Sequence, residues 1–282
     1  MKLALLFWFY KDVDICRNRL KLLRKHNPAV PIYGLYGGSP EASGHYAQAL
    51  APLLDDVFDC FTEKDGDWKW RNGDVAIAEW YRQRGQHLEW DTVFVAQWDM
   101  LVLDDLSRLL DGLRQDEVFL SGLRPIEEVR DWWPWVTRER ADYERFHDHF
   151  REQYGEQAEV LACQFVVACL SRRFLRAYST LDLELGFLEY RLPSYAGALG
   201  MTFGTCPRLE CTWPNDPQAD RSSAEPVTLT AQKVAIDFST ILRSLRDPGG
   251  ARVFHPYNRL FPVDVRSALG LAWDILATKL RR

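Results

Sequence analysis

The segment from Thr92 to Leu110, TVFVAQWDMLVLDDLSRLL, constrains the fold of this chain more than any other. It begins as a continuous apolar run, which predicts a buried strand. Asp99 stands where this run opens out, and a second apolar stretch leads to an Asp-Asp pair that starts a helix-like segment. A buried carboxylate needs a partner, because an unpaired buried charge is costly. Asp99 therefore either ends the strand in solvent or holds a divalent metal, which could in turn hold a diphosphate.

Strand-like and helix-like segments alternate through the first 120 residues. Strands are expected at the apolar segments Leu3–Tyr10, Pro31–Tyr36, Asp56–Phe61 and Thr92–Leu103, and helices at Asp12–His26 and Asp74–Arg84. This alternation predicts an α/β fold with a mainly parallel central sheet. The unbroken apolar character of Leu3–Tyr10 and Thr92–Leu103 places both strands at the centre of that sheet.

The carboxyl ends of parallel strands form the edge at which such sheets bind ligands. If the expected strands are neighbours, this edge carries Tyr10, Gly37, Gly38, Gln97, Trp98 and Asp99. A ligand site built by residues from three separate strands is therefore expected there.

The second half of the chain is less regular. Strands are expected at Glu117–Leu123 and at the start of Leu161–Leu175, and helices at Arg138–Tyr154, at Gln232–Leu245 and near the C-terminus. The Pro-rich, polar stretch Thr212–Pro226 is typical of a surface loop. No internal repeat or composition shift marks a boundary, so residues 1–282 are expected to form a single domain.

Composition excludes several classes of protein. A net charge of -5 gives no general attraction to nucleic acid or to anionic membranes. No apolar run reaches the ~18 residues of a transmembrane helix. The six cysteines lack a Cys-X-X-Cys spacing and lie mostly among apolar residues, which favours free thiols in the core of a cytoplasmic protein.

The sequence VAQWDMLVLDDL resembles the Asp-X-Asp motif of GT-A glycosyltransferases, a strand ending in two acids and followed by an apolar stretch and an acidic turn. Asp99 stands at the second acid, and Gln97 replaces the first. The resemblance implies a GT-A-like, Rossmann-related domain that transfers a sugar from a nucleotide-diphosphate sugar to an unknown acceptor. It assigns residues 1–120 to the nucleotide-sugar half and 121–282 to the acceptor side. It also implies Mn²⁺ or Mg²⁺ at Asp99, although Gln97 is a weak, uncharged ligand.

The resemblance places several residues around the donor. Tyr10, Gly37 and Gly38 would border the nucleotide, and Gln97 and Trp98 would face the sugar-nucleotide. In the segment WKWRNGDVAIAEWY, the planar donors of Arg71 suit diphosphate oxygens, while Asn72 and Asp74 suit sugar hydroxyls. The structural alternative is a turn and helix cap, which Asn-Gly-Asp forms readily.

Two further candidates concern catalysis and metal binding. Glu189, in the cleft-like sequence GFLEYRLPSYAGALG, is the candidate general base, which implies an inverting enzyme; Asp182 and Glu184 are its rivals. The resemblance also implies a late histidine that binds the metal or contacts the diphosphate, and His255, in VFHPYNR, is the candidate. Imidazole suits manganese beside a carboxylate such as Asp99. Each acid could instead face water, a lone histidine is often structural, and an enzyme that retains configuration needs no such base.

Aromatic residues are a further candidate for sugar binding, because their faces stack on sugar rings. Trp132, Trp133 and Trp135 could bind the acceptor or could form part of the core.

Two other functions fit an α/β nucleotide-binding fold. A nucleotidyltransferase would make the sugar nucleotide, but its Gly-rich phosphate loop is replaced after the first strand by Tyr10-Lys11-Asp12. A non-catalytic sugar-nucleotide-binding protein would retain the fold without turnover, and Gln97 is the residue that favours this alternative.

Overall fold

The computed structural model describes residues 1–214, 216–217, 227–232 and 236–264, so the helix expected near the C-terminus lies outside the described residues. In the first half the elements are β1 Leu3–Phe9, α1 Val13–His26, β2 Ile32–Tyr36, α2 Pro40–Leu50, β3 Asp56–Asp59, α3 Gly66–Arg71, α4 Gly73–Gln83, β4 Thr92–Gln97, β5 Leu101–Val102 and α5 Leu106–Leu109.

The second half has shorter strands and longer loops. Its elements are β6 Phe119–Leu120, β7 Arg124–Pro125, α6 Pro134–Thr137, α7 Arg140–Tyr154, β8 Leu161–Ala162, β9 Ala168–Ser171, α8 Arg172–Tyr178, α9 Leu188–Ala198, α10 Phe238–Arg246 and β10 Val253–Phe254. Short 3₁₀ turns cover Ala51–Leu53, Gly85–His87, Ile126–Glu128 and Pro207–Leu209.

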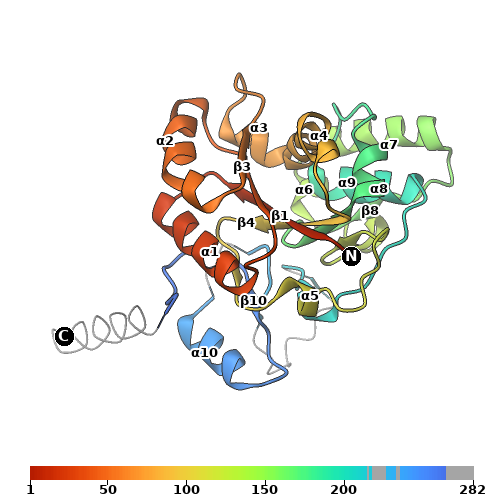
Figure 1. Cartoon of the computed structure of the whole chain (residues 1–282). Coiled ribbons are helices and arrows are strands. Elements are labelled where there is room, and N and C mark those ends of the chain that lie inside the picture. The colour runs from red at the N-terminus through yellow and green to blue at the C-terminus, as the bar shows by residue number, and fades with distance from the viewer. Residues whose placement is uncertain (215, 218–226, 233–235, 265–282) are drawn as a thin grey trace.

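A six-stranded sheet in the order β3-β2-β1-β4-β9-β6 forms the centre of the molecule (Figure 1). Strands β3, β2, β1 and β4 are parallel, and β9 runs antiparallel to both of its neighbours. The predicted α/β class with a mainly parallel sheet is therefore confirmed. The central positions expected for the first strand and for the strand before Asp99 are confirmed as well, because β1 and β4 occupy the two middle places.

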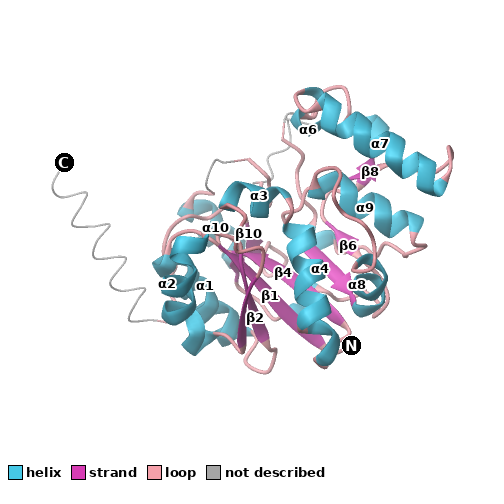
Figure 2. Cartoon of the chain, turned by 90° about the horizontal axis from the view of Figure 1, so that it is seen from above, coloured by secondary structure: helices cyan, strands magenta, loops and turns pink. Residues whose placement is uncertain are grey.

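Both faces of the sheet are covered by helices (Figure 2). Alternate side chains of β1 point to opposite faces, as the two-residue period of a strand requires. Leu6 and Trp8 join a core with α4, α8 and α9, whereas Leu5 and Phe7 join a second core with α1 and the end of α2. This double cover explains why β1 is apolar at every position.

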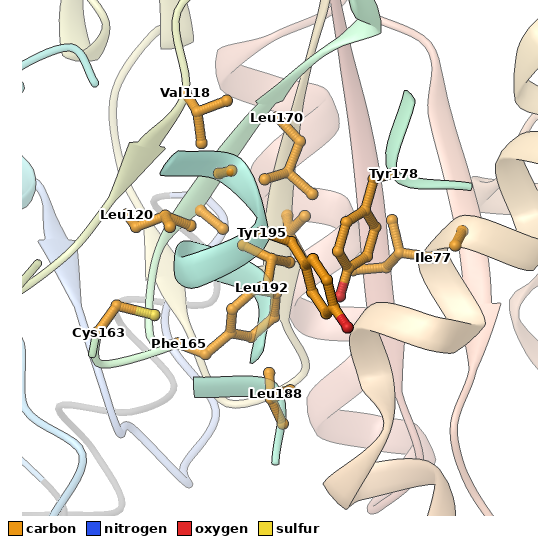
Figure 3. Packing of buried hydrophobic residues seen from close by; sticks show 14 of the residues in the cluster. Ile77, Val118, Leu120, Cys163, Phe165, Leu170, Tyr178, Leu188, Leu192 and Tyr195 are labelled. Carbon is orange, nitrogen blue, oxygen red and sulfur yellow. The ribbon is translucent and has the colours of Figure 1, made fainter. Parts of the chain in front are cut away.

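Helix α9 is anchored in the first of these cores. Its residues Leu188, Leu192 and Tyr195 point into the cluster, where Ile77 of α4 and Tyr178 of α8 also lie (Figure 3). Because α9 packs so completely, the polar residues that it carries near Leu188 are held at fixed positions.

The expected strand Thr92–Leu103 is wrong in its extent. It divides into β4 and β5, separated by a turn at 98–100 that contains Asp99. Strand β5 leaves the main sheet and pairs antiparallel with β10, Leu101 opposite Phe254 and Val102 opposite Val253. A charged residue in the turn breaks the apolar run, and this break brings the segment after β10 next to the end of β4.

Other boundaries also differ from expectation. The strand expected at Glu117–Leu123 is shorter than predicted and consists of β6 alone. The helix expected at Gln232–Leu245 begins at Phe238, and Asp237 caps it by accepting from the Ser239 N–H. All six cysteines are buried and unpaired, which confirms the free core thiols. Among the described residues, no helix has the length and apolar character needed to cross a bilayer.

Candidate functional site

The carboxyl ends of β1, β2 and β4 meet at one edge of the sheet. Phe9 is level with Tyr36, and Trp8 is level with Gln97. Beyond these ends, the Gly37 N–H donates to the Phe9 carbonyl over 2.9 Å, and the Trp98 N–H donates to the Trp8 carbonyl over 2.9 Å. The structure therefore brings Tyr10, Gly37, Gly38, Gln97, Trp98 and Asp99 to the same edge.

Gly37 and Gly38 are required there by packing. A Cβ on Gly37 would lie 2.1 Å from Nε1 of Trp8, and one on Gly38 would lie 2.4 Å from the hydroxyl oxygen of Tyr36. Trp8 and Tyr36 are both buried in the core, so a Cβ at either position would require a packed ring to shift. The two glycines thus let aromatic rings lie directly beneath the backbone at this edge.

Tyr10 and Trp98 form an aromatic wall beside Asp99. Their ring centroids lie 5.9 Å apart in an edge-to-face arrangement. Burial raises the pKa of Tyr10 to about 12, so its hydroxyl stays protonated at neutral pH. Lys11 extends from the same turn, with its Nζ 5.6 Å from the centre of the Tyr10 ring.

Asp99 and His255 meet at this edge. Nε2 of His255 lies 3.3 Å from Oδ1 of Asp99, and the two side chains are 10% and 15% exposed. Nδ1 of His255 lies 2.8 Å from the Thr230 carbonyl oxygen. A carbonyl can only accept, so Nδ1 carries a proton and Nε2 is the ring nitrogen that faces the carboxylate. In the protonated ring Nε2 donates to Oδ1 of Asp99, and in the neutral ring it presents a lone pair.

With His255 neutral, Nε2 and the Asp99 carboxylate are two facing acceptors, an arrangement that fits a bound cation. Oδ1 of Asp99 is buried and, within the described part of the chain, has no hydrogen-bond partner. A histidine whose other ring nitrogen donates to a carbonyl is the usual arrangement of a metal ligand. Among the described residues, no group of three or more His, Cys, Asp or Glu side chains is arranged so that it could hold a metal ion. The remaining ligands of a cation at Asp99 and His255 would therefore be water or substrate oxygens.

Gln97 and Glu189 are hydrogen-bonded to the two backbone groups of Phe165, its carbonyl and its N–H. The side-chain amide of Gln97 donates to the Phe165 carbonyl, and the Phe165 N–H donates to Oε1 of Glu189 over 2.8 Å. Gln97 is therefore bonded to the protein through its amide nitrogen. A single peptide segment links the end of β4, where Asp99 follows, to the first turn of α9, where Glu189 lies.

Glu189 has the properties of an acid that titrates near neutrality. Burial raises its pKa to about 7, and contacts to the Phe165 amide and the Trp135 side chain together with the charge of His255 oppose the shift. Its rivals Asp182 and Glu184 are both exposed to solvent. Of the three candidate bases, the structure gives only Glu189 a buried environment close to His255.

The tryptophans expected near the acceptor divide into two groups. Trp133 is buried in the core and packs edge-to-face against Trp213, as Trp132 also does. Trp135 is half-buried beside Glu189, and its ring centroid lies 5.4 Å from that of Trp70. Only Trp135 therefore has the position expected of a residue that borders the site.

The prediction that Asp74 binds sugar hydroxyls is wrong. Asp74 and Arg191 are both 0% exposed, with Nη2 of Arg191 2.5 Å from Oδ1 and Nε 2.8 Å from Oδ2. The hydroxyl of Tyr178 also donates to Oδ2. Both carboxylate oxygens are thus satisfied internally, and the pair joins the start of α4 to α9.

Arg71 and Asn72 are likewise engaged within the protein. Arg71 makes two hydrogen bonds to the carboxylate of Glu139, and its guanidinium lies over the rings of Trp135 and Phe187. Asn72 accepts from Nη2 of Arg191 and donates to the Trp68 carbonyl. Neither side chain can reach a donor without giving up these partners.

Phe165 and Thr230 contribute to the site but were not identified from the sequence. Both act through the backbone, Phe165 with its N–H and carbonyl and Thr230 with its carbonyl. Every residue type offers these groups, so no side-chain pattern could have revealed them.

Comparisons with known proteins give low similarity. No protein-family model matches the chain, and no curated protein matches it. Among solved structures it is similar to the bifunctional glycosyltransferase WbbM in its apo form, with 10% identity over 91% of this chain and a TM-score of 0.45. The glycosyltransferase GlyE of Streptococcus pneumoniae TIGR4 is 14% identical over 64%, with a TM-score of 0.34.

The galactosyltransferase LgtC, solved with donor and acceptor sugar analogs, is 13% identical over 75% of this chain, with a TM-score of 0.39. The matched region spans 46% of WbbM, 37% of GlyE and 76% of LgtC. All three are named as glycosyltransferases. TM-scores below 0.5 do not establish a common fold, so the function of this chain has to be inferred from its own geometry.

Proposed function

We propose that this protein is a glycosyltransferase that moves a sugar from a nucleotide-diphosphate sugar to a hydroxyl-bearing acceptor. The observation that carries the proposal is the grouping at one sheet edge. Asp99 faces His255 at 3.3 Å, and Glu189 is linked to the same strand end through Phe165. Carboxyl edges of parallel strands are where nucleotides bind in open α/β sheets.

Asp99 and His255 are proposed to hold Mn²⁺ or Mg²⁺ together with the diphosphate of the donor. Two protein ligands would leave positions on such a cation for phosphate oxygens and water. When bound, the cation neutralises the charge that develops on the leaving diphosphate. Tyr10 and Trp98 offer aromatic surface next to this position, and the amide of Gln97 keeps the Phe165 loop in place.

Glu189 is proposed to act as general base. The acceptor oxygen attacks the anomeric carbon as the bond from that carbon to the diphosphate oxygen breaks. The bonding electrons leave with the nucleoside diphosphate, and the acceptor proton passes to the Glu189 carboxylate. A single displacement of this kind inverts the anomeric configuration. The pKa of about 7 lets Glu189 be ionised before attack and still accept a proton efficiently near neutral pH.

The test is direct. Purified protein is incubated with UDP-, GDP-, CDP- and TDP-sugars, with Mn²⁺, with Mg²⁺ and with EDTA, and the released nucleotide is identified. The proposal expects a nucleoside diphosphate to appear, dependent on metal and absent in Asp99→Asn. NMR of the product reads the anomeric configuration, and retention would reject Glu189 as base but not the transferase.

Other outcomes separate the alternatives. Formation of a sugar nucleotide from a nucleoside triphosphate and a sugar phosphate, with pyrophosphate released, would identify a nucleotidyltransferase. A thermal shift with one sugar nucleotide but no turnover against a broad panel of acceptors would favour a non-catalytic binding protein. No shift with any nucleotide would contradict the proposal as a whole.

A further inference from the structure

Arg19 is a buried cation next to the candidate cation site. It lies in α1 with 1% of its surface exposed. Nη2 donates to the carbonyls of Tyr257 and Arg259 over 2.5 and 2.7 Å, and Nη1 donates to Oδ1 of Asn18 over 2.5 Å. The guanidinium also lies over the Tyr257 ring, 5.2 Å from its centre.

No carboxylate forms a salt bridge with Arg19 in the described part of the chain, and its Nε is buried without a hydrogen-bond partner. Burial lowers the pKa of Arg19 to about 10, and the charge of Asp99 is among the influences that oppose this shift. The guanidinium stays protonated at neutral pH. A buried charge of this kind is costly unless it is hydrogen-bonded, and the hydrogen-bond partners of Arg19 are two backbone carbonyls and Oδ1 of Asn18.

Those carbonyls belong to the segment that carries His255. The Tyr257 N–H donates to the Asp99 carbonyl over 2.8 Å, while the Tyr257 carbonyl accepts from Arg19. Nδ2 of Asn18 donates to the Phe261 carbonyl over 2.7 Å, and Oδ1 of Asn18 accepts from the Phe261 N–H over 3.0 Å. Two consecutive residues of α1, Asn18 and Arg19, are therefore hydrogen-bonded to the segment 257–261. This segment begins two positions after His255.

We propose that Arg19 is a positioning residue for the candidate cation site: it holds residues 257–261 against α1, and thereby keeps Nε2 of His255 opposite the Asp99 carboxylate. The proposal rests on the proposed function for its metal, but the anchoring that it describes can be measured without one. It assigns to Arg19 no contact with substrate. The planar fork of arginine suits this task, because it can reach two carbonyls at once in fixed directions.

The test compares Arg19→Lys with Arg172→Lys. Arg172 is a matched control, because it too donates to backbone carbonyls, including that of Trp90 over 3.0 Å, and lies over an aromatic ring, with 4.9 Å to the centre of Trp90. It sits at the start of α8, next to the amino end of β4, away from Asp99. Two quantities are measured in each variant: the Mn²⁺ dissociation constant by EPR and the hydrogen exchange rate of the Tyr257 amide by NMR.

Arg19→Lys is expected to weaken Mn²⁺ binding at least about tenfold, the size of effect seen when the supports of metal ligands are removed. Exchange of the Tyr257 amide is expected to accelerate by a similar factor. Arg172→Lys is expected to change neither quantity more than twofold, whatever its effect on the melting temperature. Equal effects of the two variants, or none in Arg19→Lys, would overturn the proposal.

The outcomes separate this inference from the proposed function. If the wild-type protein binds no Mn²⁺, the proposed cation site is rejected, and the positioning role of Arg19 is judged from hydrogen exchange of the Tyr257 amide. Faster exchange in Arg19→Lys supports that role, and unchanged exchange overturns it. If Arg19→Lys does not fold, Tyr257→Leu replaces it, because this change removes the ring over the guanidinium but leaves the carbonyl. A smaller loss of Mn²⁺ affinity is then expected, and an unchanged affinity overturns the proposal.

Discussion

Nε2 of His255 lies 3.3 Å from Oδ1 of Asp99, while Nδ1 of the same ring is bonded to the Thr230 carbonyl. The ring is therefore fixed in orientation, with Nε2 directed at a carboxylate oxygen, Oδ1, that is buried without a hydrogen-bond partner in the described structure. Removal of either side chain should weaken the cation binding that we propose.

The first prediction uses this pair. His255→Gln and Asp99→Asn should each weaken Mn²⁺ binding by about 10–100-fold or more. Loss of a residue that only supports a metal ligand already costs this much affinity, and loss of the ligand itself should cost no less. Isothermal titration calorimetry measures the affinity. His147→Gln is the control, because His147 and Asp148 form a similar pair at 3.2 Å on the surface of α7. Unchanged affinity in His255→Gln would exclude it as a ligand.

The second prediction concerns Glu189 and pH. Its folded pKa of about 7 lies above the ordinary value of 4.5, so the folded state binds this proton more tightly than the unfolded state. The stability that follows is present below about pH 4.5 and is lost as pH rises through 7. At 1.36 kcal/mol per pH unit, the loss is about 3 kcal/mol.

Glu189→Gln removes this titration. Urea unfolding should show the variant to be more stable than wild type at pH 8, with a smaller decrease in its stability between pH 5 and pH 8. Sugar transfer should be lost in the variant, and kcat/KM of the wild type should rise through pH 7 as the base ionises. A wild-type rate that is independent of pH between 6 and 8 would argue against the base.

The third prediction concerns the buried pair of Asp74 and Arg191. Asp74→Asn should destabilise the fold by about 3–5 kcal/mol, because it leaves a buried guanidinium without its counter-charge. Asp14→Asn is the matched control: Asp14 pairs with Arg17 on the exposed surface of α1, and its loss should change stability by no more than about 0.5 kcal/mol. Urea denaturation midpoints compare the two, and equal midpoints would contradict the structural role.

The fourth prediction concerns Arg71. Because its guanidinium is bonded to Glu139 in a partly exposed position, Arg71→Ala should lower stability by about 1 kcal/mol. The affinity for the sugar nucleotide identified in the turnover screen should remain within twofold of wild type. A tenfold loss of that affinity, with stability unchanged, would show that Arg71 does contact the sugar nucleotide.

The fifth prediction concerns two glycines. Gly37→Ala should destabilise the protein by about 1–3 kcal/mol, since its Cβ would overlap the Trp8 ring. Gly44→Ala, in α2 with nothing within 4 Å of its Cβ, should stabilise by up to about 1 kcal/mol. Differential scanning calorimetry reads both changes. A neutral Gly37→Ala would show that the ring can move aside.

The layers of the fold were predictable from local pattern. Apolar runs such as Leu3–Phe9 have to be covered on both faces, and alternation with amphipathic helices requires parallel neighbours. Asp99 was recognisable for the same reason, because a lone acid at the end of such a run conflicts with stability unless it has a partner. These inferences need only the nearest residues along the chain.

The roles of the polar residues were decided by tertiary structure. The sequence Asn-Gly-Asp favoured a ligand site or a helix cap equally, but Asp74 meets Arg191 across 117 positions of the chain and is buried with it. His255 reaches Asp99 only because β10 pairs with β5, and Glu189 titrates near neutrality only because α9 packs into the core. Local periodicity determines which residues are apolar on which face, whereas burial and ion pairing depend on contacts between segments distant in the sequence.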